Sequence, residues 1–231
     1  MCIRDSSIRL GTTPLSAINT TGSVSLRNRT AGIGINIGAA DTLGASGTLG
    51  LLQDELNVVR ASHLIIGQST SGNILVSSPV TTLSTSGNVS VISGGSISVN
   101  QSLTAGANLI LQTNGGNIAN TAAISGVNVS IDNTNGSING TTGAITEGSA
   151  NSGSAVGISA GSSITATGNL NMLGVSTGNM GLEVLANSTL RGGNIQAIGR
   201  VSNGWHGVLI NSGSSVITTG GSGDSLIRGI C

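Results

Sequence analysis

The residues best suited to chemistry in this 231-residue chain are Trp205 and His206, which lie between two glycines in a Gly-Trp-His-Gly stretch. A histidine can act as a general acid or base, but cleavage of a glycosidic bond needs a pair of carboxylates beside that bond. The main acidic residues of the second half are instead scattered, at Asp132, Glu147, Glu183 and Asp224. We therefore expect no catalytic residue, and we expect Trp205 and His206 to lie on an exposed loop, which is a candidate contact for a partner.

Metal and cofactor motifs are weak as well. His63 has no second histidine, cysteine or carboxylate at the spacing of a metal-ligand set, and we expect it at a corner of the fold. The Gly-Ile-Gly stretch at 32–34 lacks the third glycine of a dinucleotide-binding turn. Residues 220–224 offer a single copy of a calcium-binding repeat that works only in multiple copies. We predict no metal and no cofactor.

The charge balance excludes two classes of partner. The chain has eight arginines, no lysine and eight acidic residues, so its formal net charge is zero. A protein without a basic surplus has no electrostatic surface for nucleic acid or for anionic membranes. Trp205 is the single aromatic residue, so the platforms on which bases stack are missing too. No apolar run approaches the ~20 residues of a membrane helix, and we expect neither nucleic-acid binding nor membrane insertion.

Apolar residues recur along the chain with one period of 20 or 21 residues. Three interleaved series share it: Val89, Leu109 and Val129; Ile97, Ile118 and Ile138; Leu83, Leu103, Ile124 and Ile145. Three series with one period indicate three short strands in each repeat. Strands this short are not stable as isolated hairpins.

Such strands become stable when the chain coils, because each strand then pairs in parallel with its equivalent one turn earlier and like side chains stack inside. We therefore predict an all-β fold, a right-handed parallel β-helix (solenoid) with about ten coils of 20–26 residues. The asparagines at 88, 108 and 128 precede equivalent strands. We expect their amides to hydrogen-bond along the rod.

The repeat length changes near residue 148. Over residues 7–148 we expect regular coils of about 20 residues, and over residues 149–231 coils of about 25, since Leu182 and Val208 are 26 residues apart. The added residues predict loops at one corner of each coil, at 147–155, 174–180 and 199–206. These loops would project from one flank of the rod.

The two ends of the chain do not match the repeat. Residues 1–6, Met-Cys-Ile-Arg-Asp-Ser, lack the apolar region of a signal peptide. We interpret them as a translated sequencing adapter and expect them to lie outside the fold. We expect the remainder to be an internal fragment of a longer protein, truncated at residue 231.

Residues 54–80, DELNVVRASHLIIGQSTSGNILVSSPV, resemble a segment of filamentous-haemagglutinin-like proteins, the large adhesins of two-partner secretion in Gram-negative bacteria. The shared pattern is a Glu-Leu pair, an L-x-I-G strand, a Gly-Asn-Ile strand and a proline turn. It is found here at Glu55-Leu56, Leu64 to Gly67, Gly72 to Ile74 and Pro79. Stretches that begin at residues 103, 162 and 203 are similar to repeats of the same family, and the resemblance covers Ser7 to Ile230.

This resemblance implies a secreted or surface-exposed adhesive rod, exported through an outer-membrane transporter and bound to a cell-surface receptor or glycan. We expect such a virulence-associated adhesin without enzymatic activity, with the flank from Glu147 to His206 as its contact region. The alternative is a passenger that spaces or delivers a contact-dependent toxin, or the passenger of an autotransporter. A polysaccharide-cleaving β-helix enzyme is the third interpretation.

Overall fold

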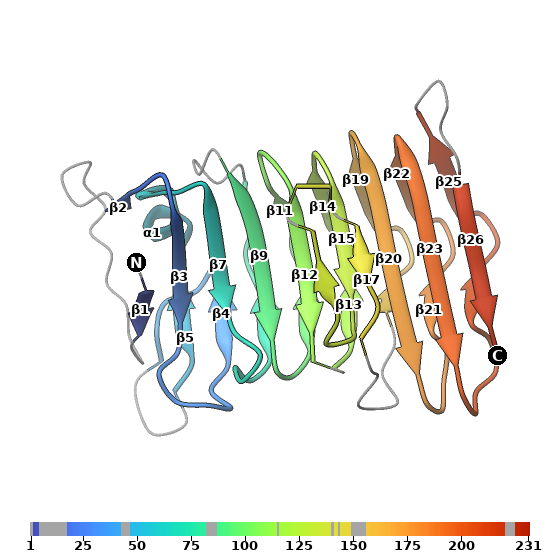
Figure 1. Cartoon of the computed structure of the whole chain (residues 1–231), viewed down its shortest axis with the longest axis horizontal. Helices are drawn as coiled ribbons and strands as arrows, with labels where there is room; N and C mark the ends of the chain where they lie inside the picture. Colours follow the sequence, from blue (N-terminus) through green and yellow to red (C-terminus); the bar gives the residue numbers. More distant parts are fainter. Residues whose placement is uncertain are drawn as a thin grey trace.

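The computed structural model describes residues 2–4, 18–42, 47–81, 87–114, 116–139, 141–142, 144–148, 156–219 and 225–231. The strands follow one another in a right-handed coil that advances along a rod from the N-terminal to the C-terminal end (Figure 1). Each regular coil passes once through three parallel sheets, here called sheets 1, 2 and 3. The predicted all-β parallel β-helix is therefore confirmed.

Sheet 1 is the front sheet of Figure 1 and has nine strands in the described part of the chain. In spatial order they are β1 (Cys2–Arg4), β3 (Ser23–Arg27), β7 (His63–Gly67), β9 (Asn88–Ser93), β12 (Leu109–Thr113), β15 (Val129–Asp132), β20 (Asn169–Ser176), β23 (Asn194–Val201) and β26 (Ser225–Ile230).

Sheet 2 consists, in spatial order, of β5 (Leu49–Leu51), β4 (Ile35–Ile37), β8 (Ile74–Val76), β10 (Ile97–Val99), β13 (Ile118–Asn120), β18 (Val156–Ile158), β21 (Leu182–Val184) and β24 (Val208–Ile210). Sheet 3 consists of β11 (Leu103–Thr104), β14 (Ala123–Gly126), β19 (Ser163–Ala166), β22 (Thr189–Gly192) and β25 (Ser215–Thr218). The remaining elements are the pair β2 (Ile18–Asn19) and β6 (Val59–Arg60), the pair β16 (Ser137–Ile138) and β17 (Ile145–Thr146), and the short helix α1 (Gln53–Asn57).

The core is a stack of aliphatic side chains that alternate with outward-facing residues along each strand. In sheet 1, Leu109 pairs with both Val89 and Val129, as the first series predicts, and all three are fully buried. The asparagine ladder is present in part, because Asn128 Nδ2 donates to Asn108 Oδ1 at 2.8 Å. Stacking of like residues thus fixes the register of the central coils.

The prediction of one coil every 20 residues is wrong for residues 133–148. Ile118 pairs with Val156, not with Ile138, and Ile124 pairs with Ile164, not with Ile145. Ile138 and Ile145 instead pair with each other in the antiparallel hairpin of β16 and β17. Leu83, the first member of the third series, lies outside the described residues.

Two side-chain turns explain this departure from the coil. The backbone N–H of Thr134 donates to Asp132 Oδ1 at 2.8 Å, which bends the chain outward at the end of β15. Asn139 Oδ1 accepts the N–H groups of Thr141 and Thr142, both at 2.9 Å, and closes the hairpin. We call residues 133–148 the insertion.

Two of the predicted corner loops are shorter than expected, because part of each is strand. Residues 174–176 belong to β20 and residues 199–201 belong to β23, which pair with each other over eight positions. The loops that remain, 177–181 and 202–207, both connect sheet 1 to sheet 2. The part of the third predicted loop from 149 to 155 lies outside the described residues.

The expectation that residues 1–6 contribute nothing to the fold is also wrong for part of that segment. Cys2 to Arg4 form β1, which pairs in parallel with Ser25 to Arg27 of β3. Pairing along a strand edge uses backbone groups, so an extended segment of almost any sequence can extend a sheet.

The described part of the chain contains no helix of the length and apolar character required to cross a bilayer.

Candidate functional site

Trp205 and His206 lie in the loop 202–207, which connects β23 to β24 at one end of the rod (Figure 1). The Trp205 side chain is 81% exposed, so the expected exposure is observed. The loop backbone is fixed on the preceding coil, where Gly181 N donates to His206 O at 3.2 Å and Leu182 N donates to Gly207 O at 2.9 Å. The structure thus presents an aromatic ring to solvent from a loop that is hydrogen-bonded to the preceding coil.

The acidic residues do not gather around His206. Among the described residues, the one ion pair joins Arg200 to Glu147 at 2.8 Å, and His206 has no carboxylate within 4.0 Å. No three His, Cys, Asp or Glu side chains in the described ranges are grouped as a metal site would require. Asp224 lies outside the described residues. Among the described residues, no carboxylate therefore lies beside His206 to form an acid–base pair with it.

His63 is the first residue of β7 and directly follows the bend at Ser62, so it borders a corner of the coil. Its Nε2 is 2.8 Å from the hydroxyl of Ser90 on the neighbouring strand. Partial burial lowers the pKa of His63, because burial disfavours the charged imidazolium.

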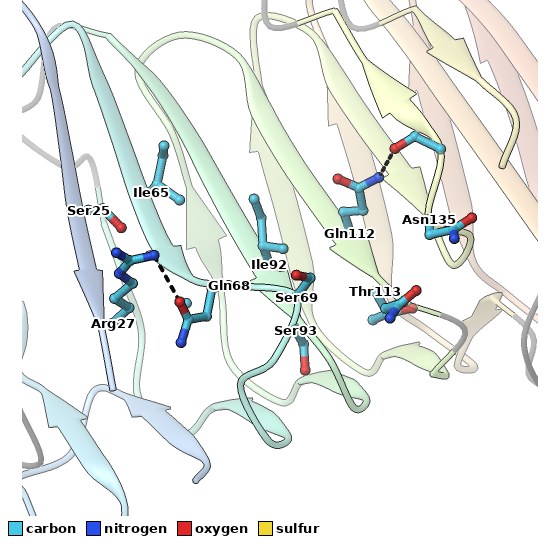
Figure 2. Close-up of a pocket in the computed structure, with 13 residues that line it drawn as sticks. Ser25, Arg27, Ile65, Gln68, Ser69, Ile92, Ser93, Gln112, Thr113 and Asn135 are labelled. Atoms are coloured by element: carbon cyan, nitrogen blue, oxygen red, sulfur yellow. Dashed lines mark hydrogen bonds between the residues drawn. The ribbon is translucent and has the colours of Figure 1, made fainter. Parts of the chain in front are cut away.

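A second surface, which the sequence did not reveal, is a groove on the outer face of sheet 1 with a volume of about 740 Å³. Figure 2 shows that it crosses the strands from β3 to β12 and ends at the insertion. We call it the outer groove. Its lining comprises Ser25, Arg27, Ile65, Gly67, Gln68, Ser69, Ile92, Ser93, Gln112, Thr113, Asn114, Asn135 and Gly136.

The floor of the outer groove is made by outward-facing residues whose strand neighbours fill the core. Ile65 and Ile92 lie on its floor, and they alternate with buried Leu64, Ile66 and Val91. Amides and hydroxyls surround these two isoleucines. The result is a small apolar surface within a polar channel, which suits an amphipathic ligand.

Arg27 marks one end of the outer groove. Its Nη1 donates to Gln68 Oε1 at 2.9 Å (Figure 2). Gln68 Nε2 in turn donates to the carbonyl of Asn28 at 3.3 Å. This chain of bonds holds the guanidinium in place. Arg29 is exposed and lines an adjoining cleft of about 400 Å³ together with Arg27, Asn28 and Gln68.

The insertion closes the other end. Gln112 Nε2 donates to the carbonyl of Gly136 at 2.6 Å, which ties the insertion to β12 (Figure 2). The amides of Asn108 and Asn128 both donate to the carbonyl of Thr141, at 2.9 and 3.1 Å. The insertion therefore packs on the outer face of sheet 1 and turns an open sheet surface into a bounded groove.

Asp132 is buried beneath the insertion, in the same register row as Gln112 and Ile92. Its Oδ1 accepts the N–H and the hydroxyl of Thr134, but its Oδ2 is buried without a hydrogen-bond partner. Burial raises the pKa of Asp132 to about 6, the bonds from Thr134 oppose this, and the charge of nearby Glu147 adds to the rise. The hairpin of the insertion thus brings Glu147 near Asp132.

Comparisons with protein-family models, with curated proteins and with solved structures gave no match. The resemblance to filamentous-haemagglutinin-like proteins therefore stays an expectation from the residues at 54–80. In the structure, Glu55 and Leu56 lie in α1, Leu64 to Gly67 lie in β7, and Ile74 begins β8. The pattern thus spans the helix and the first two strands of one coil.

Proposed function

We propose that this chain is the rod of a secreted or surface-exposed bacterial exoprotein that attaches to a cell-surface receptor or glycan and carries out no catalysis. The observation that carries the proposal is the placement of two contact surfaces, the outer groove and the loop 202–207, on one continuous aliphatic β-helix. A rod of stacked coils holds such surfaces at fixed spacing. Export from a Gram-negative cell by a two-partner or autotransporter route belongs to the same proposal.

The geometry of the loop 202–207 supports binding to a partner more than it supports catalysis. A tryptophan that is 81% exposed leaves a large apolar area in water, and exposed aromatic residues are frequent energetic centres of interfaces. No described carboxylate accompanies His206. A passenger that delivers a toxin would not need the exposed ring, and this favours adhesion over the spacer alternative.

Binding of the purified chain to cultured cells tests the proposal. Replacement of Trp205 by alanine is expected to weaken cell binding about tenfold or more, as for an interface centre, with no change in thermal stability because the ring is exposed. Val127→Ala is the matched control, because Val127 is an exposed apolar residue at a different corner, between β14 and β15.

Trp205 is also the single aromatic residue, so its fluorescence reports directly on the contact loop. A blue shift of its emission on binding is expected, since the ring would leave water. Absence of wild-type binding to any cell type, or release of reducing ends from polysaccharides by the chain, would overturn the proposal.

A further inference from the structure

We propose that the outer groove binds a short acidic oligosaccharide lengthwise along the rod, with a carboxylate of the ligand held by Arg27 and Arg29. This inference rests on the proposed adhesive function and identifies the ligand class for one of its two surfaces. It is carried by the shape, the polarity and the charge of the groove.

The shape fits a chain of a few rings. Neighbouring strands of a sheet lie about 4.8 Å apart, so the span from β3 through β7 and β9 to β12 is about 15 Å. That length accommodates about three or four pyranose rings, one for each strand crossed. The volume of about 740 Å³ lies within the usual range of small-ligand sites.

The lining matches the two sides of a sugar ring. Ile65 and Ile92 offer an apolar floor for the C–H face of a ring (Figure 2). Gln68, Gln112 and Asn135 place amides along the groove. Planar amides both donate and accept hydrogen bonds, as vicinal hydroxyls require.

The positive charge at one end of the outer groove favours an acidic ligand and determines which way round that ligand lies in the groove. Among the described residues that line the outer groove, Arg27 is the one with a charged side chain. Arg29 shares the adjoining cleft and forms no ion pair with any described carboxylate. A planar guanidinium matches a carboxylate in a two-bond arrangement. At the far end Asp132 lies buried beneath the insertion, so an anionic group is favoured only at the Arg27 end.

The test is an array of carboxylated, sulfated and neutral oligosaccharides of three or four rings, probed with the full chain, followed by calorimetric titration of the tightest carboxylated probe. Arg27→Gln is expected to weaken binding about tenfold or more, because a hydrogen bond to a charged group is lost. Because Arg29 is exposed, Arg29→Gln should weaken binding less than Arg27→Gln does. Arg191→Gln on β22, an exposed arginine in sheet 3, is the matched control and should leave affinity unchanged.

Selective binding of carboxylated probes, lost when the carboxylates are reduced to alcohols, supports the proposal. It is overturned if no carboxylated probe binds, if sulfated probes bind equally well, or if both Arg27→Gln and Arg29→Gln bind like the wild type. Melting temperatures of the variants separate a lost contact from a lost fold. Cell binding that depends on Trp205, together with a negative array, would refute this inference and leave the adhesive function standing.

Discussion

Replacement of Asp132 by asparagine should stabilise the rod at neutral pH. The Asp132 carboxylate is fully buried, and its Oδ2 has no hydrogen-bond partner. Asparagine has the same shape as protonated aspartate and keeps an oxygen to accept the bonds from Thr134. The substitution therefore removes an unfavourable buried charge without opening a cavity.

The magnitude follows from the raised pKa of Asp132, about 6 against an ordinary value of 3.8 for an aspartate. Since each pKa unit corresponds to about 1.4 kcal/mol, the ionised carboxylate costs about 3 kcal/mol well above pH 6. The folded chain holds the proton more tightly than the unfolded chain. The stability of the wild type should therefore increase as the pH falls through the window from about 7 to 4, with a gain of about 1 kcal/mol between pH 7 and pH 5.

Thermal unfolding followed by far-UV circular dichroism measures this effect. At about 2–4 °C for each kcal/mol in a chain of this size, Asp132→Asn should raise the melting temperature by about 6–12 °C at pH 7 and by little at pH 4. Asp54→Asn on the exposed face of α1 is the matched control for removal of one negative charge. The reasoning is refuted if Asp132→Asn lowers the melting temperature at pH 7, or if the wild type loses stability between pH 7 and pH 5.

Two further predictions concern the packing that holds the outer groove in place. Leu111→Ala should cost about 2–5 kcal/mol of unfolding free energy in denaturant titrations, because the side chain is fully buried, whereas Val127→Ala at an exposed site should cost little. Gly67→Ala should lower the melting temperature, because Gly67 has a φ of 82° and an added Cβ would lie 2.3 Å from the carbonyl oxygen of Ile92. Gly106→Ala, where an added Cβ meets nothing within 4 Å, should leave the melting temperature nearly unchanged, and equal losses at the two glycines would contradict the reasoning.

The sequence determined the kind of fold and much of its register. A period of 20 residues in Val89, Leu109 and Val129 is enough to predict parallel stacking, because a buried strand tolerates only one register for its inward side chains. Apolar residues with the longer spacing of the C-terminal coils also stack on one another, as in the pairing of Leu170 with Ile195. The exposure of Trp205 was also predictable, since a bulky ring between glycines in an inserted stretch has no place in thin aliphatic layers.

Tertiary structure alone decided where residues 133–148 go. Ile138 and Ile145 have the spacing of a coil, but spacing does not state which strand an apolar residue pairs with, and two side-chain turns made a hairpin more favourable. That hairpin then packed on the outer face of sheet 1, buried Asp132 and bounded the outer groove. Both consequences depend on contacts between distant segments, and for that reason neither the raised pKa of Asp132 nor the groove beside Arg27 can be read from the order of residues.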